Sequence, residues 1–225
     1  MSGVLIVKPL PLAAAPTIVG GGSGAAVTVD SFYLGYTNAD AGAVWNLQTG
    51  TALGTGLVTV AASTPMRAAD SEGPRHHCFR RLAAPVTSRY FRIATNQSGT
   101  VPLYIGALVI GLAFEKHREF GPGRTPIDTG TRQDLPSGGF GIGDGVVKSQ
   151  FAFSFVDLTQ SEKNRLWSIK KDRGLRKPVL LVEDAHLSEG LNDAIHYGPF
   201  ERFQPYERAR ADRHSGFPKG VSADS

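Results

Sequence analysis

Alternating apolar and polar residues along the first half of the chain predict a series of β-strands. Runs rich in β-branched and aromatic residues are separated by polar or glycine-containing segments such as "NADAG" and "DSEGPR". Short apolar runs bounded by turn residues are typical of strands in antiparallel sheets. Six strands are expected, over residues 26–37, 43–47, 56–61, 76–82, 89–95 and 103–114. This spacing favours an antiparallel sandwich or barrel.

The segment "SRYFRIATNQSGTVPLYIGALVIG" contains two of these strands joined by a polar connection. Because side chains alternate across a strand, Phe91 and Ile93 are predicted to fill the core, whereas Arg92 faces solvent or a partner. Gly106 and Gly111 interrupt the second apolar run. A glycine inside a strand often marks a bulge or a close approach of another backbone, and we expect one of these here.

A glycine- and proline-rich segment separates the two halves of the chain. "FGPGRTPIDTGTRQDLPSGGFGIGDGV", residues 120–146, has no periodic apolar face. Connections of this length in a compact protein are usually functional or act as linkers. The segment is therefore predicted to be a long loop or an extended arm that is available for assembly.

The second half of the chain predicts strands around a single helix. In residues 148–159, Phe151, Phe153 and Phe155 alternate with smaller or polar residues and share one face. Further strands are expected at residues 177–184 and 194–208. One helix among strands indicates an α+β or mainly β unit. The polar residues after the last strand are expected to be frayed.

The helix between the first two of these strands has clear start and stop signals. Thr159 and Glu162 have the spacing of a capping box, in which each side chain accepts a hydrogen bond from the backbone N–H of the other residue. Its apolar side is formed by three residues, Leu166, Trp167 and Ile169. Gly174 is expected to end the helix.

Composition agrees with a strand-rich protein and excludes few classes of function. The 225 residues are 41% hydrophobic and include 27 glycines and 14 prolines, which favours short strands and turns. The length allows one large domain or two modest ones. A net charge of +4 is too mild to indicate nucleic-acid binding. The single cysteine, Cys78, excludes an internal disulfide and favours folding in a reducing compartment.

The apolar N-terminus is not expected to be a signal peptide. "MSGVLIVKPLPLAAAP" lacks a basic start, and Lys8, Pro9 and Pro11 interrupt its apolar run. The rest of the sequence has no apolar run of about 18 residues, so no membrane span is expected.

Two glycine-rich stretches resemble phosphate-binding loops in composition alone. "GGFGIGDG", residues 138–145, follows a proline-rich segment and precedes a strand, whereas a dinucleotide fingerprint follows a strand and opens a helix. "GGGSG", residues 20–24, lacks the required Lys and Ser or Thr, and no helix follows it as a nucleophile elbow requires. We expect both to be flexible loops, and no cofactor is predicted.

Metal and cysteine chemistry are not favoured. His76 and His77 are adjacent on a predicted strand and would point to opposite faces, and no second ligand cluster is present. The other histidines stand alone at His117, His186, His196 and His214. Cys78 as a nucleophile would need a base and an orienting carboxylate that nothing in the local sequence indicates. We expect Cys78 to be a buried apolar residue.

Three other residue groups allow a functional and a structural interpretation. Six carboxylates in loops or at strand ends are hydrolase candidates or ordinary turn formers: Asp128, Asp134, Asp144, Asp157, Glu183 and Asp184. The basic cluster at residues 163–177 predicts a solvated helix face or a contact with an acidic partner. Four aromatic residues could stack on a sugar or belong to the core: Trp45, Tyr33, Tyr36 and Tyr104.

The pair of strands in the first half resembles the late strands of discoidin-like, or galactose-binding-like, jelly rolls. In that family a strand of the form R-Y-x-R-I precedes a strand with I-G-x-L. The matching residues here are Arg89, Tyr90, Arg92, Ile93, Ile105, Gly106 and Leu108. "AVWNL", with Trp45 near a turn, also fits the pattern. The family's sugar- and calcium-binding loop residues have no counterpart in this sequence.

The whole pattern, over about residues 26–208, resembles structural proteins of tailed bacteriophages, with the distal tail protein as the nearest analogy. The later residues that carry the resemblance are Ser137, Gly138, Gly139, Phe153, Ser154, Leu158, Thr159, Glu162 and Leu166. "GLRKPVLL" (174–181) and "HYGPF" (196–200) continue it. Proteins of this family form rings that join the tail tube to the tip.

The resemblance implies a mainly β fold with a jelly-roll-like β-sandwich and a second, β-barrel-like unit with one short helix. The expected divisions are a sandwich domain at 1–118, a linker or arm at 119–147, and a second unit with a polar tail at 148–225. The implied function is non-enzymatic: a tail-tip or baseplate ring protein that acts in tail assembly, made in the host cytoplasm and located in the virion tail. No catalytic residue, cofactor or metal is expected.

The implied partners are copies of the chain itself, in a ring such as a hexamer or trimer, and other tail proteins. Binding to a membrane or to a specific nucleic acid is not expected, whereas a glycan remains possible. The candidate subunit contacts, chosen because they are predicted on exposed strand faces or arms, are Arg92, Arg132, Phe140, Phe200, Phe203 and Tyr206.

Two alternatives remain open. The chain is a monomeric carbohydrate-binding module if Trp45 or a tyrosine is exposed and stacks on a glycan. It is a hydrolase if two carboxylates meet in a cleft. A ring in electron micrographs favours the assembly function, and glycan affinity lost on Trp45→Ala favours the carbohydrate-binding module.

Overall fold

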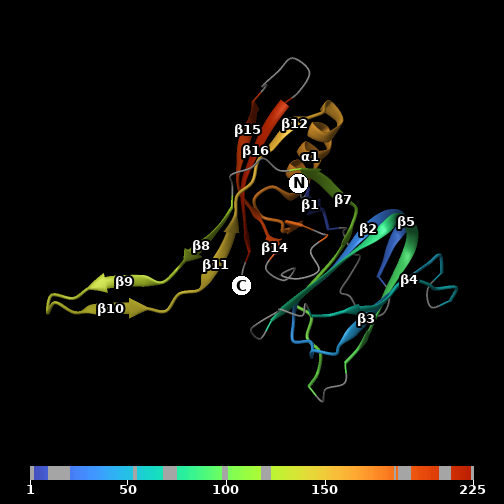
Figure 1. The fold of residues 1–225 in the computed structure, drawn as a ribbon, viewed down its shortest axis with the longest axis horizontal. Coiled ribbons are helices and arrows are strands. Elements are labelled where there is room, and N and C mark those ends of the chain that lie inside the picture. Colours follow the sequence, from blue (N-terminus) through green and yellow to red (C-terminus); the bar gives the residue numbers. More distant parts are fainter. Residues whose placement is uncertain are drawn as a thin grey trace. The chain divides into compact units, whose positions relative to one another are not determined.

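The chain folds into a mainly β protein. The computed structural model describes residues 3–9, 21–52, 55–67, 75–97, 101–117, 123–184, 186, 194–207 and 214–223, with the backbone alone at 3, 21–24, 156 and beyond 201. Strands make up 60% of the structure, in several antiparallel sheets consistent with a β-sandwich, and the described residues contain one helix. The mainly β fold expected from the alternating sequence is therefore confirmed. Figure 1 shows these elements along the chain.

The chain forms two compact units. The first unit contains residues 1–115 and 180–195, and the second contains residues 116–179 and 196–225. The units differ from the contiguous halves expected from the sequence, because a short segment from the second half of the chain belongs to the first unit. The arm predicted at 119–147 belongs to the second unit.

A five-stranded antiparallel sheet forms most of the first unit. Its strands follow the order β4-β3-β5-β2-β6. They are β2 (Gly21–Thr37), β3 (Val44–Gly50), β4 (Val58–Pro65), β5 (His76–Asn96) and β6 (Ala107–Gly111). Strands are therefore present at each position where alternation predicted them, although their bounds differ.

Strand β5 corresponds to two of the predicted strands. It pairs with β2 along one part, where Val29 lies opposite Val86, and with β3 along another, where Leu47 lies opposite Ile93. The expected break between residues 82 and 89 is wrong, because this stretch stays paired with β2 through register shifts. The last predicted strand, in contrast, is divided into β6 and β7 (Ala113–His117).

The core of the first unit lies against this sheet. Phe91 and Ile93 are buried while Arg92 between them is exposed, as the alternation predicted. The Phe91 ring lies 6.1 Å from that of Phe32, and Trp45 belongs to the same cluster. Each large side chain removed from water in this way contributes about 1.5–3 kcal/mol, so burial of one strand face strongly specifies the register.

A four-stranded sheet brings together strands from both ends of the sequence. Its order is β14-β13-β1-β7, with β1 at Gly3–Val7, β13 at Val179–Val182 and β14 at Ile195–Gly198. All four residues of β13 are buried, as expected for a strand covered on both faces. A Cβ added to Gly111 would collide with the Lys8 carbonyl, which confirms the close backbone approach predicted at this glycine.

The second unit is built around a five-stranded sheet. Four of its strands follow the order β12-β16-β11-β8, and β15 also pairs with β16. These strands are β8 (Arg124–Asp128), β11 (Val147–Phe151), β12 (Phe155–Leu158), β15 (Phe200–Glu207) and β16 (His214–Ala223). The prediction of a frayed C-terminal segment is wrong for residues 214–223, because β16 pairs with three other strands.

The alternating phenylalanines form the core of this unit. Phe151, Phe153 and Phe155 are buried, and the Phe153 ring lies 5.6 Å from Phe151 and 5.3 Å from Phe155. His196 stacks on Phe151 at 5.2 Å with nearly parallel rings. The predicted shared apolar face is therefore confirmed, although the chain leaves the strand conformation between β11 and β12.

Helix α1 (Gln160–Arg173) begins and ends where its signals predicted. The Thr159 hydroxyl accepts from Glu162 N, and Glu162 Oε2 accepts from Thr159 N at 2.8 Å. Gly174 closes the helix with a φ of 56°. Leu166 and Ile169 are buried as expected, but Trp167 is 52% exposed, so its assignment to the apolar side is wrong.

Candidate functional site

Residues 124–151 form a long two-stranded hairpin. Strand β8 pairs with β11 next to the main sheet of the second unit, and β9 (Thr131–Asp134) pairs with β10 (Phe140–Gly143) further out. Figure 1 shows β9 and β10 extending away from β8 and β11 as a separate two-stranded ribbon. The expectation of an extended arm is met in that the segment projects, but a paired hairpin replaces the predicted loop.

Local hydrogen bonds join the inner and outer parts of the hairpin. Thr129 N donates to the Val146 carbonyl at 3.2 Å, and Val146 N donates to the Thr129 hydroxyl at 2.9 Å. Asp128 Oδ1 accepts from Gly130 N at 2.8 Å, which forms a tight turn. A Cβ on Gly145 would collide with the Gly130 backbone. Glycine is therefore required at position 145, where the two strands of the hairpin approach each other closely.

The tip of the hairpin is closed by a turn rich in glycine. Leu135 N donates to the Gly139 carbonyl at 2.8 Å, and Gly138 N donates to the Leu135 carbonyl at 3.0 Å. Gly138 has a φ of +82°, a conformation that a residue with a Cβ rarely adopts. The stretch expected to be a flexible loop, residues 138–145, is instead this turn followed by β10 and the junction.

One face of the outer hairpin carries its large side chains. Phe140 and Ile142 alternate with two glycines on β10, and they lie opposite Asp134 and Arg132 of β9. The Arg132 guanidinium lies 4.7 Å from the centre of the Phe140 ring and 3.7 Å from Asp134. The large side chains of β10 thus point to one face, and the opposite face of this strand carries only hydrogen atoms.

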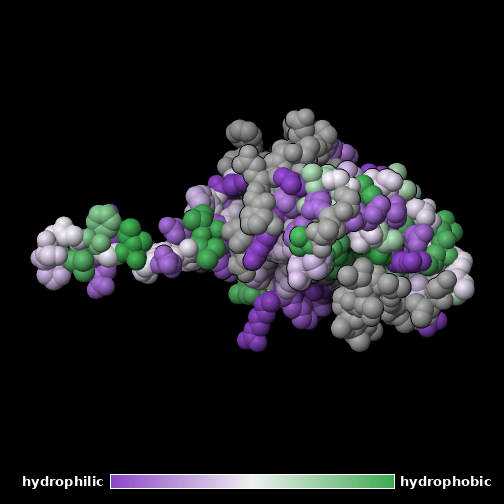
Figure 2. All heavy atoms as spheres, turned by 90° about the horizontal axis from the view of Figure 1, so that it is seen from below, coloured by the Kyte–Doolittle hydropathy of each residue, from purple (hydrophilic) through white to green (hydrophobic). Residues whose placement is uncertain are grey.

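Hydrophobic side chains on the hairpin are unusually exposed. Phe140 is 56% exposed and Ile142 is 73% exposed. Five of the eleven large hydrophobic side chains that are exposed in the described part of the chain belong to this hairpin: Leu135, Phe140, Ile142, Val146 and Val147. Figure 2 shows the hydrophobic spheres on the narrow projection. We call these five side chains the hairpin patch.

The six predicted contact residues have different outcomes. Arg92, Arg132 and Phe140 are exposed, as the prediction required. Phe200 is only 1% exposed, so the expectation that it lies on an accessible surface is wrong. It begins β15 and packs inward. Phe203 and Tyr206 lie on the same strand, and their side chains are outside the described residues.

Four of the five patch residues were not among the predicted contacts: Leu135, Ile142, Val146 and Val147. The signal that could have revealed two of the patch residues is the period of two in "FGIG", which places Phe140 and Ile142 on one side of a strand. The interpretation of this stretch as a flexible loop concealed the period. Their exposure follows only from the position of β10 beyond the main sheet.

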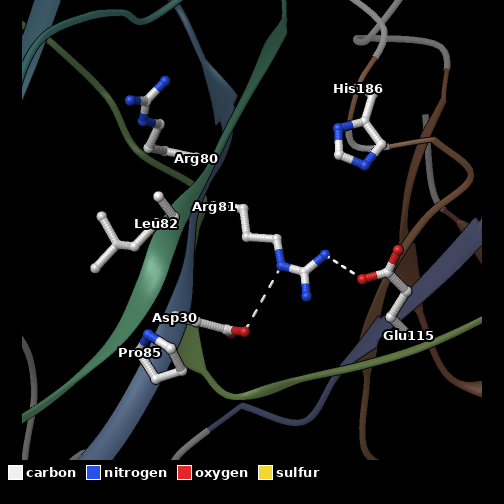
Figure 3. A pocket seen from close by; sticks show the side chains of 8 residues that line it. Asp30, Arg80, Arg81, Leu82, Pro85, Glu115 and His186 are labelled. Atoms are coloured by element: carbon white, nitrogen blue, oxygen red, sulfur yellow. Dashed lines mark hydrogen bonds and ion pairs between the residues drawn. The ribbon is translucent and has the colours of Figure 1, made fainter.

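A pocket in the first unit contains charged side chains, and ion pairs compensate its carboxylates. Its volume is about 480 Å³. Figure 3 shows the Arg81 side chain between Asp30 and Glu115, with which it forms ion pairs. Asp30 Oδ1 also accepts from Ser31 Oγ and Ala113 N, both at 2.8 Å. Asp30 therefore anchors the end of β7 to β2, a structural role.

The aromatic residues proposed to stack on a sugar are mostly internal. Trp45 is 1% exposed and Tyr33 is fully buried, so an exposed Trp45 is excluded. Tyr33 Oη and His77 Nδ1 lie 2.6 Å apart, and Tyr36 contacts the same imidazole edge-on at 4.8 Å. Tyr104 is 66% exposed. These contacts give the two inner tyrosines a packing role.

Cys78 lies in surroundings that suppress its reactivity. It is 4% exposed, and its thiol donates to the Pro65 carbonyl at 2.9 Å. Burial raises its pKa to about 12, although the neighbouring Trp45 indole and the Arg80 charge act in the opposite direction. A thiol is nucleophilic as the thiolate, so the predicted role as a buried apolar residue is confirmed.

His76 is also buried, and burial together with the Arg67 charge lowers its pKa. No group of three or more His, Cys, Asp or Glu side chains suited to a metal ion occurs in the described residues.

The basic cluster on α1 includes one buried residue. Lys170 is 4% exposed, and burial lowers its pKa to about 8. Lys171 and Arg165 on the same helix are exposed, as the solvated-face interpretation predicted. Lys170 is therefore the exception, and sequence position alone did not distinguish it from its neighbours.

Comparison with known proteins finds no matching family model, no matching curated protein and no matching solved structure. Among the parts of the chain that the structure describes, no helix is long and apolar enough to cross a membrane.

Proposed function

We propose that the protein is a non-enzymatic structural component of a tailed-phage virion, a tail-tip or baseplate ring protein that joins the tail tube to the tip. In this proposal the first unit is a jelly-roll-like sandwich and the second a barrel-like unit with one helix. The observation that carries the proposal is the hairpin patch, because its hydrophobic side chains are exposed on a hairpin whose outer strands form a sheet of their own.

A two-stranded hairpin has little stability by itself in water, because it buries too few side chains. Contiguous exposed apolar side chains on a soluble protein mark a surface that contacts another molecule. The outer hairpin combines both features, since Phe140 and Ile142 are exposed and, among the strands that the structure describes, β9 and β10 pair only with each other. A contact that covers this ribbon would remove apolar surface from water and order the hairpin.

The chemistry of the patch suits a protein partner. Aromatic and arginine side chains are enriched at the energetic centres of protein interfaces. Arg132 over the Phe140 ring provides one of each, and Asp134 compensates the arginine charge. Function by assembly needs only surface complementarity, so no side chain has to act chemically.

The resemblance to tail proteins adds the identity of the assembly. Its strand residues lie on two strands of the same sheet, with Arg89 and Ile93 on β5 and Leu108 on β6, and β2 lies between these strands. Ile93 is buried, and the exposed Arg89 guanidinium lies 5.4 Å from the centre of the Tyr90 ring. The capping box at Thr159, another part of the resemblance, starts the helix of the second unit.

Sedimentation velocity and negative-stain electron microscopy of the full chain test the proposal. We expect closed rings for the wild type, and a smaller assembly for the double variant Phe140→Ser/Ile142→Ser, because the hairpin contact is lost. Val58→Ser is the matched control, because Val58 is 64% exposed on β4 in the other unit. Wild-type protein that stays monomeric up to the highest soluble concentration contradicts the proposal, as does a double variant whose assembly is as large as that of the wild type.

A further inference from the structure

We propose that the free edge of β10 pairs in antiparallel fashion with β10 of a second copy of the chain. Two hairpins would then form one four-stranded sheet in the order β9-β10-β10-β9. The inference rests on the proposed function in so far as both need a contact at the hairpin. It adds the partner and the register of that contact.

The edge of β10 lacks the features that protect edge strands. Natural edge strands avoid unwanted pairing with charged residues, proline or bulges. β9 carries Arg132 and Asp134, and β8 contains Pro126, whereas "FGIG" in β10 has neither a charge nor a proline. The β9–β10 pairing is also regular, without a register shift. β10 is therefore the edge of the hairpin best able to accept another strand.

The backbone of β10 presents its free groups at two positions. Leu135 N donates to the Gly139 carbonyl, and in an antiparallel ladder directly bonded pairs alternate with unbonded ones. Following the register from this bond, Gly141 directs its N–H and C=O groups toward Gln133 of β9. Phe140 and Ile142 consequently direct theirs to the free edge, where a second strand can bond to both.

These two positions define one self-complementary register. Phe140 of one copy lies opposite Ile142 of the other, and each such pair exchanges two backbone hydrogen bonds. Gly141 then lies opposite Gly141 of the second copy, on the two-fold axis. Residues directly opposite each other share a face, so both phenylalanines and both isoleucines gather on one side. The contact covers the apolar residues of β10 with their own counterparts.

Charge favours a second copy as the occupant. Residues 124–151 contain three basic residues, Arg124, Arg132 and Lys148, and three acidic residues, Asp128, Asp134 and Asp144. The hairpin is therefore neutral, whereas the whole chain carries +4, so two hairpins meet without the repulsion that the rest of the surface would produce. Arg132 also has Asp134 as a partner within its own hairpin.

A two-fold contact closes on a pair of subunits, whereas a ring requires head-to-tail contacts. The proposed ring would therefore use a second surface for its closure, and the hairpins would join two rings face to face. A hexamer made of two trimeric rings fits both contacts.

Cysteine cross-linking of the full chain tests the register. Cα atoms of an unbonded antiparallel pair lie about 4.5 Å apart, within the range that a disulfide spans. Gly141→Cys places both thiols there, and its Cβ meets only the Gln133 carbonyl, at 3.9 Å. Gly139→Cys is the control, because two residues from the axis its thiols are separated by about 13 Å. Native Cys78 is buried and does not compete.

We expect Gly141→Cys to form a covalent dimer under mild oxidation in at least ten times the yield of Gly139→Cys. Adding Ile142→Asp should abolish this dimer, while melting curves of all variants remain those of the wild type. Equal yields at the two positions, or no dimer from Gly141→Cys, would overturn the inference.

The proposed function is judged separately, by sedimentation of the wild type. Wild-type rings combined with an unreactive Gly141→Cys would leave the ring function in place and remove only the β10 pairing. A cross-linked Gly141→Cys dimer with no wild-type ring would support the β10 pairing and contradict the proposed ring function.

Discussion

Replacing Ile142 with serine removes the most exposed large hydrophobic side chain of the described structure, and we expect it to weaken self-association strongly. Burying an isoleucine side chain completely contributes about 1.5–3 kcal/mol. Ile142 is 73% exposed, so covering the exposed part in an interface contributes about 1–2 kcal/mol. A two-fold contact contains the residue twice, which gives about 2–4 kcal/mol, or about 30- to 1,000-fold in Kd.

Sedimentation equilibrium over a concentration series measures this change directly. Fold stability provides the control, because substitution of an exposed residue usually changes the free energy of unfolding by less than about 0.5 kcal/mol. We expect Ile142→Ser to have an unchanged melting temperature together with a raised Kd. Val58→Ser removes a similarly exposed apolar side chain from β4 and should leave Kd unchanged.

A Kd for Ile142→Ser within about threefold of the wild type would refute this reasoning, since that difference corresponds to about 0.6 kcal/mol. An equal loss of association in Val58→Ser would also refute it, because the effect would then not belong to the hairpin.

Three further predictions concern the stability of the fold. Lys170 has a pKa of about 8 in the folded chain instead of 10.5, so between these pH values the unfolded chain binds one more proton than the folded chain. The free energy of unfolding should therefore rise from about pH 8 to 10.5. Chemical denaturation across that range should show this rise for the wild type and not for Lys170→Met. Phe153→Ala should cost about 3–5 kcal/mol in urea unfolding, because the ring lies between two others, and retention of wild-type stability would show that the cluster is not a core. Gly111→Ala should lower the free energy of unfolding by the cost of overpacking, about 1–3 kcal/mol, because its Cβ meets the Lys8 carbonyl, and its melting temperature should fall accordingly. Gly42→Ala is the control and should leave the melting temperature unchanged, because a Cβ there meets nothing within 4 Å.

The candidate site was only partly predictable. Glycine and proline content located the projecting segment, and Arg132 and Phe140 were selected from it. Pairing between β9 and β10 was missed, because the glycines in "FGIG" reduce the strand signal. Phe200 was selected on the same reasoning as Phe140, yet it is buried. Both residues are aromatic and occur in predicted extended segments, so local sequence does not separate them.

Local sequence was sufficient wherever neighbouring residues determine the outcome. The alternation of Phe91 and Ile93 with Arg92 assigned strand faces, and the capping box at Thr159 positioned the helix, because period and capping depend on residues within one turn or one strand. Tertiary structure decided which of these faces is covered. The pairing of β13 with β1, the burial of Lys170 and the exposure of Ile142 all depend on which segments meet across the chain. Such pairing is set by the summed burial of many side chains, which no short stretch of sequence contains.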